Sequence, residues 1–138
     1  MATTLTGQIV EALGAAISVT ALVPATSIYM GELPEGTGLP ACEVAEGSTS
    51  IDLNFSSSII ERAGITVTVY AVGAAATDLI QRTVQAILDP YTASFTNNQI
   101  MACLRESMEI QPDGRQVQGD LVFKATSRYT VLVEVSLV

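Results

Sequence analysis

The chain has 138 residues and a formal net charge of −8, from 14 acidic and 6 basic residues. This length indicates one domain, residues 1–138, whose core is large enough to fold without a metal or a disulfide. The basic residues are scattered, which argues against nucleic-acid binding, and histidine is absent, which removes the usual general base and the commonest metal ligand.

The first predicted element is a helix from about Thr4 to Thr20. Apolar residues recur along it every four positions and form one stripe: Leu5, Ile9, Leu13 and Ile17. Thr3 or Thr4 is expected to cap its start, and Pro24 lies beyond its end. The first 23 residues lack a basic segment and are interrupted by polar residues, so we predict neither a signal peptide nor a membrane span.

Two short strands and two long loops follow. We predict strands at Ser27–Met30 and at about Ala41–Glu46, with Cys42 and Val44 on the inner face of the second. Three glycines and two prolines mark residues 31–40 as an ordered loop. Residues 47–57 are polar and poor in β-formers, so they are also predicted to be a loop.

The strongest strand signal spans Ile65–Val72. Inward and outward residues alternate in it with period two: Ile65, Val67, Val69 and Ala71 inward, Thr66, Thr68 and Tyr70 outward. This alternation is typical of a half-buried antiparallel strand. A bulge or tight turn is expected at Ala63–Gly64, and Ile59–Arg62 either extends the strand or forms an arm of its own.

The second half of the chain predicts a helix and two strands. The helix spans about Ala74–Leu88 and is ended by Asp89-Pro90. Its inner stripe is Ala76, Ile80, Val84 and Ile87, with Asp78, Gln81, Arg82 and Gln85 outside. A strand at about Ile100–Ile110, a hairpin turn at Gln111–Arg115 and a last strand at about Ala125–Leu137 complete the chain. The last strand turns these residues inward: Tyr129, Val131, Val133, Val135 and Leu137.

The element order α-β-β-β-α-β-β indicates the α+β class, with one antiparallel sheet and both helices packed on one face. The other face carries residues that suit either water or a neighbouring subunit: Thr66, Thr68, Tyr70, Thr130, Leu132 and Glu134. Charged residues make up only 14% of the chain, which favours either a surface partly covered by partners or a well-filled core under a Thr/Ser-rich exterior.

No group of residues predicts catalysis. Glu106 and Glu109 lie on opposite faces of a strand, and no glycine-rich loop precedes a Lys-Ser/Thr pair, so neither acid–base chemistry nor phosphate binding is indicated. Cys42 and Cys103, in a chain without histidine, do not make a zinc site and are predicted to be buried, reduced thiols. The sequence therefore predicts a protein that is not an enzyme and has no catalytic, cofactor-binding or metal-binding residues.

Several segments together resemble one protein family. After the N-terminal helix they are Ile28–Gly36 (IYMGELPEG), Leu39-Pro40-Ala41, a Thr/Val strand ending in Tyr70-Ala71, an Ala-rich helix with Leu79, Val84 and Leu88, and a closing strand that contains Arg128–Val135. Over almost the whole chain, this order is similar to the tail terminators, or tail-to-head joining proteins, of long-tailed bacteriophages. The motifs are a Tyr-x-Gly-x-Leu-Pro turn and the order of elements.

The resemblance implies a ring of six copies in the tail or neck of a virion that is assembled in the host cytoplasm. Such a ring caps the tail tube, stops its polymerisation and joins it to the neck. The implied partners are copies of the chain itself, the tail tube protein and a neck or head-completion protein, with no cofactor and no membrane. DNA passes through the channel without specific binding, which agrees with the acidic balance. Cys42 and the polar 47–57 segment depart from the family pattern.

Apolar residues in the two predicted loops are our candidate subunit contacts: Leu33, Pro34 and Phe55. Acidic residues of the same loops are candidates for the channel wall: Glu32, Glu35 and Asp52. Two alternatives remain open, namely another neck or tail-completion protein of similar fold, and an adaptor module that works as a monomer or a dimer.

Overall fold

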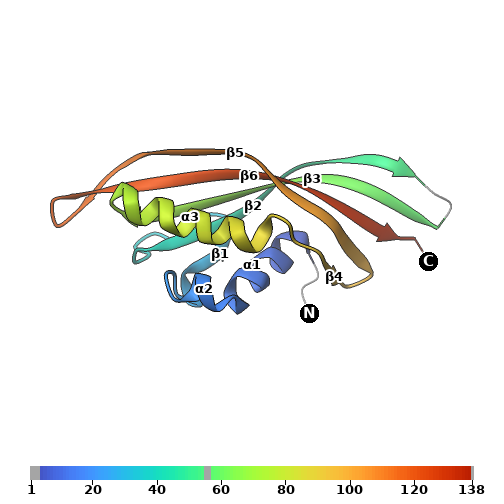
Figure 1. Cartoon of the computed structure of the whole chain (residues 1–138), viewed down its shortest axis with the longest axis horizontal. Helices are drawn as coiled ribbons and strands as arrows, with labels where there is room; N and C mark the ends of the chain where they lie inside the picture. The colour runs from blue at the N-terminus through green and yellow to red at the C-terminus, as the bar shows by residue number, and fades with distance from the viewer. Residues whose placement is uncertain (1–3, 55–56, 138) are drawn as a thin grey trace.

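The computed structural model describes residues 4–54 and 57–137, and within them six strands form one sheet in the order β1-β2-β3-β6-β5-β4. The helices all lie on one face of this sheet (Figure 1). The elements are α1 Leu5–Ala15, α2 Ile17–Thr20, the 3-10 turn η1 Ala25–Ser27, β1 Ile28–Met30, β2 Ala41–Asn54, β3 Ser58–Val72, α3 Ala74–Leu88, β4 Ala93–Phe95, β5 Asn98–Val117 and β6 Asp120–Ser136. The predicted α+β layering is therefore confirmed. The sheet is antiparallel except at its edge, where β1 pairs with β2 in parallel.

The N-terminal helix is shorter than predicted. Thr4 caps α1, since its Oγ1 accepts the Gly7 N–H at 3.0 Å. The helix ends at Ala15, and the extended backbone of the next residue, Ala16 (φ −81°, ψ 113°), redirects the chain into α2. The prediction that Ile17 continues the buried stripe is wrong, because after this break its side chain is 84% exposed and Val19 is buried in its place. The other three residues of the stripe are buried.

The segment 47–57, predicted to be a loop, is mostly strand. β2 continues through it to Asn54 and pairs with β3 as far as Asn54 opposite Ile59. The period-two pattern is missing there because residues 45–54 are exposed on both faces of the hairpin. The bulge expected at Ala63–Gly64 lies on the partner strand, where the register shifts between Glu46 and Thr49 opposite Gly64.

The inner faces of β2 and β3 agree with the predictions. Cys42 and Val44 are buried, and so are all four inward residues of the strong strand signal. β3 begins at Ser58, so of the two alternatives for Ile59–Arg62 the structure shows the first, in which the segment extends this strand. Within the described residues the helices leave the other face of the sheet free (Figure 1). Tyr70 belongs to that face, because it alternates with the buried residues Val69 and Ala71.

Helix α3 has the predicted bounds, but its buried stripe is rotated. Ile80 and Val84 are buried as expected, together with Thr77, Gln81 and Leu88. The predictions for Ala76, which is exposed, and for Gln81, which is buried, are wrong. Four residues turn an α-helix by about 400°, so a strict four-residue spacing drifts off the buried side by about 40° per step.

The β5–β6 hairpin is longer than predicted. Its turn is not at Gln111–Arg115 but at Gln118 and Gly119, whose positive φ angles of 52° and 87° suit a tight two-residue hairpin. Pro112 to Gln116 instead forms an irregularity within β5, with Gly114 at φ +96°. At the end of β6, Leu137 is exposed, so its predicted inward orientation is also wrong. Strand β4, with Phe95 buried, was not predicted.

Candidate subunit-interaction surface

The candidate contact residues Leu33 and Pro34 lie in the loop between β1 and β2, which folds over the helix-free face of the sheet. Glu43 of β2 fastens this loop. One of its carboxylate oxygens accepts the Leu33 N–H at 3.0 Å, and the other accepts the Tyr70 hydroxyl at 2.9 Å. Leu33 is half-buried, whereas Pro34 is exposed. The loop is therefore held to the sheet by a polar contact and presents an apolar corner to solvent.

A polar recess of about 320 Å³ separates this loop from the irregular part of β5. Its lining is mostly acidic and polar: Glu32, Leu33, Pro34, Glu35, Gly36, Thr37, Glu43, Tyr70, Asp113 and Arg115. The Arg115 guanidinium lies 5.5 Å from the centre of the Tyr70 ring and also pairs with Asp113. Burial and the hydrogen bond to Glu43 raise the pKa of Tyr70 to about 12, so its hydroxyl remains a donor at neutral pH.

The acidic candidates do not gather in one place. Glu32 and Glu35 are exposed on the β1–β2 loop, beside the recess. Asp52 lies near the far end of β2, where its Oδ2 is 3.4 Å from Arg62 Nη2. The thirteen steps from Ala41 to Asn54 span roughly 40 Å of strand. Glu32 and Glu35 thus lie at one end of the sheet and Asp52 at the other.

Phe55, the third predicted contact residue, lies outside the residues that the structure describes. Its neighbours in β2, Ile51 and Leu53, are both exposed. The hairpin of β2 and β3 that carries them reaches past the helical layer (Figure 1). The sequence predicted one apolar contact residue in a loop, Phe55, whereas the structure shows two exposed apolar side chains on a strand, Ile51 and Leu53.

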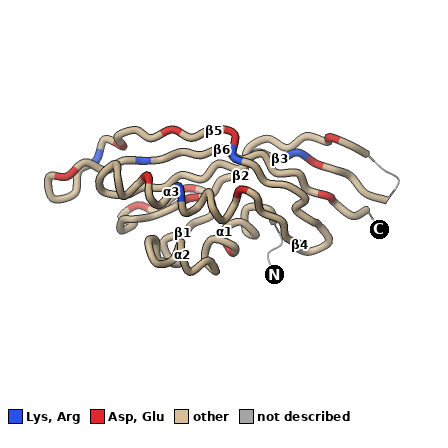
Figure 2. Tube along the Cα trace, viewed as in Figure 1, with Lys and Arg blue, Asp and Glu red and all other residues tan. Residues whose placement is uncertain are grey.

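Charge is distributed unevenly over the molecule. Figure 2 shows acidic positions along the strands and hairpins, whereas α1 and α2 carry one charged residue, Glu11. Four of the six basic residues belong to β5 and β6: Arg105, Arg115, Lys124 and Arg128. The β2–β3 side of the sheet is therefore the more acidic side.

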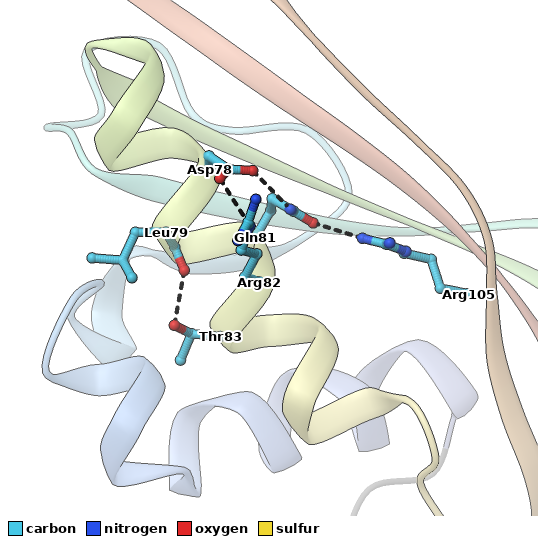
Figure 3. A network of polar contacts seen from close by, with 6 residues as sticks. All are labelled: Asp78, Leu79, Gln81, Arg82, Thr83 and Arg105. Carbon is cyan, nitrogen blue, oxygen red and sulfur yellow. Dashed lines mark hydrogen bonds and ion pairs between the residues drawn. The ribbon is translucent and has the colours of Figure 1, made fainter.

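A partly buried polar network, which was not predicted from the sequence, joins α3 to β5. Gln81 Oε1 accepts a hydrogen bond from Arg105 Nη1 at 3.0 Å, and Gln81 Nε2 donates to Asp78 at 3.1 Å (Figure 3). Asp78 also pairs with Arg82 at 2.9 Å. Asp89, just after the helix, accepts the backbone N–H of Arg105 at 3.1 Å. These contacts fix the helix on the sheet, and Leu79 points away from them (Figure 3).

Both cysteines lie in the buried part of the protein. Cys42 and Cys103 are free and buried, as predicted. Burial raises the pKa of each thiol to about 12, so both are protonated and poor nucleophiles at neutral pH. Among residues 4–54 and 57–137, no three His, Cys, Asp or Glu side chains are grouped so that they could hold a metal ion. In the same residues, no helix is long and apolar enough to cross a membrane.

Comparison with known proteins gives a likeness of fold. No protein-family model and no curated protein matches the chain. A solved structure described as the virion of a native gene transfer agent (GTA) particle contains a similar chain, with a TM-score of 0.68 and 16% sequence identity. The match covers 91% of this chain and 91% of that chain. The chain therefore shares, over nearly its whole length, the fold of a protein found in a gene transfer agent virion.

Proposed function

We propose that this chain is a structural subunit of a phage-like virion, a tail terminator that forms a ring of six copies. The ring caps the tail tube, stops its polymerisation and joins it to a neck or head-completion protein. The observation that carries the proposal is the likeness of fold to a gene transfer agent virion chain over 91% of both chains. The sequence resemblance to tail terminators supports it independently.

The arrangement of the surface supports a ring. In a cyclic ring each subunit offers two different complementary surfaces, because the contact is heterologous. The Leu33–Pro34 corner and the exposed end of β2 lie at opposite ends of one sheet, so a neighbour can be contacted on each side. Phe55 remains a predicted contact of the second surface.

The proposed channel is lined with negative charge. A net charge of −8 repels the DNA backbone and keeps DNA mobile in a channel. Glu32 and Glu35 are our first candidates for its wall, because neither takes part in an ion pair that the structure records. Asp52 is a weaker candidate, since Arg62 offsets part of its charge. DNA passes through without specific binding.

The proposed role is structural and needs no catalytic residue or cofactor. The alternatives are another neck or tail-completion protein of similar fold and an adaptor that works as a monomer or dimer. Light scattering after size exclusion, with electron microscopy of the protein alone and with tail tubes, separates them. Six-fold rings at tube ends support the proposal. A protein that stays monomeric or dimeric at every concentration and ignores tube ends contradicts it and favours the adaptor.

A further inference from the structure

Two strands of the sheet leave their outer edges open. β1 pairs with β2 only from Cys42 to Val44, and β4 pairs with β5 only from Asn98 to Ile100. Within the described part of the chain, residues 45–54 of β2 and residues 101–117 of β5 therefore have no strand on their outer side. An open edge presents unpaired backbone N–H and C=O groups, with which another extended strand can pair.

Exposed apolar side chains are concentrated on these edges. Six of the eleven large hydrophobic side chains that are exposed in the described residues belong to β2 and β5: Ile51, Leu53, Met101, Leu104, Met108 and Val117. Edges that must stay free in solution are usually guarded by lysine or proline. Residues 45–54 contain neither, so another strand can pair along this edge except where the register of β2 shifts, between Glu46 and Thr49 and between Ile51 and Leu53.

The directions of the two edges are complementary. β2 is separated from β5 by three antiparallel pairings, β2–β3, β3–β6 and β6–β5, so β2 and β5 run in opposite directions. A second copy, rotated about an axis roughly along the strands, brings its β5 against the β2 of the first copy as an antiparallel neighbour. One such contact covers both kinds of edge, and its repetition closes a ring.

The two-fold alternative covers fewer of the open edges. Pairing β2 with itself leaves both β5 edges open, whereas pairing β2 with β5 covers one edge of each kind in every contact. Asp89 already accepts the Arg105 backbone N–H, and the irregularity of β5 begins at Pro112, which has no backbone N–H. A new regular pairing on β5 is therefore limited to residues 106–111.

We infer that residues 45–54 of β2 in one copy pair, antiparallel, with residues 106–111 of β5 in a second copy, so that the sheet continues from subunit to subunit. This inference rests on the proposed ring for its number of copies, and it names the surface by which neighbouring subunits meet. Residues 106–111 can pair with the part of β2 that contains Ile51 and Leu53, and these two side chains become covered in the contact.

Cysteine cross-linking in assembled protein tests the contact. Ile51→Cys and Leu53→Cys report on β2, Met108→Cys and Glu109→Cys report on β5, and Ile17→Cys is an exposed control on α2. The two native thiols are buried, and cross-linking of the wild-type protein measures how much they contribute. We expect oxidised dimers on non-reducing gels when a β2 variant is mixed with a β5 variant. We expect none from either variant alone or from any mixture with the control.

A substitution series gives the second measurement. The double variant Ile51→Lys with Leu53→Lys places lysine on the open edge of β2, where it opposes pairing with another strand. It should lower the assembled fraction at least tenfold without changing the thermal midpoint. The control Ile17→Lys should change neither quantity. Rings that form without cross-links between β2 and β5 variants overturn this inference and leave the proposed function intact. Self-cross-linking of Ile51→Cys alone overturns it in favour of a two-fold contact. A wild type that never associates overturns both.

Discussion

At the scale of single residues, Tyr129 is an unusual member of the core. Its side chain is 1% exposed, and its hydroxyl has no hydrogen-bond partner among the described residues. The ring gains from burial, whereas the hydroxyl loses its hydration without compensation, and burial raises the pKa of Tyr129. The aromatic ring therefore stabilises the fold, and the oxygen opposes it.

We expect Tyr129→Phe to stabilise the domain by about 1 kcal/mol, because it removes an unpaired buried polar atom and keeps the ring. Tyr70→Phe is the matched control, since it removes a hydroxyl that donates to Glu43 at 2.9 Å and should lower stability. Thermal and urea unfolding measure both. A loss of stability in Tyr129→Phe as large as that in Tyr70→Phe would show that the Tyr129 hydroxyl is satisfied.

The buried thiols predict a loss of stability at alkaline pH. The pKa of Cys42 is raised from 9.0 to about 12 in the folded protein. Below pH 9 the thiol is protonated in both the folded and the unfolded protein, and its burial costs no stability. As pH rises from about 9 to about 12, the thiol ionises in the unfolded protein but not in the folded one, so stability is lost across this window. The thermal midpoint of wild type should fall through this window. A Cys42→Ala variant should show a shallower fall, and an equal slope in both proteins would exclude the thiol as a cause.

At the scale of elements, sequence patterns predicted the elements that bury one face and missed the strand segment that is exposed on both faces. Helix α3 was placed with its observed bounds, because an apolar stripe and a terminating Asp89-Pro90 define it. The outer half of β2 was missed, since a strand exposed on both faces has no alternation to detect. The β5–β6 turn was misplaced, because Pro112-Asp113-Gly114 has the chemistry of a turn and here forms an irregularity within a strand.

The link between α3 and β5 belongs to this scale as well. Gln81→Ala leaves the Arg105 guanidinium without its acceptor beneath the helix, and we expect a cost of about 1–3 kcal/mol. Gln85→Ala, at a half-buried position of the same helix, is the control and should cost less than about 0.5 kcal/mol. Urea unfolding of the two variants measures both losses in the free energy of unfolding. Equal costs would show that helix propensity, and not the network, sets the effect.

At the scale of the whole molecule, the candidate surface was predictable only in part. The low charged fraction and the apolar residues of the 31–40 loop pointed to contacts near Leu33 and Pro34. The role of Glu43 in fastening that loop was hidden, because Leu33 and Tyr70 converge on it from separate segments of the chain. The open edges were hidden for a similar reason, since the order of strands in a sheet is set by long-range pairing that no local pattern records.

The fastened loop gives a last prediction for assembly. If the Leu33–Pro34 corner contacts a neighbour, removing its apolar atoms should weaken the ring while leaving the core unchanged. We expect Leu33→Ala with Pro34→Ala to raise the protein concentration needed for assembly by about tenfold, the usual effect of losing one buried apolar anchor. Glu43→Ala should act in the same direction, because it releases the Leu33 N–H and lets the loop move. Light scattering and tube-capping assays measure both variants, with Ile17→Ala, at an 84% exposed site on α2, as the control. If the double variant caps tubes as well as wild type, the loop is an ordinary connection and the subunit contact lies elsewhere on the sheet.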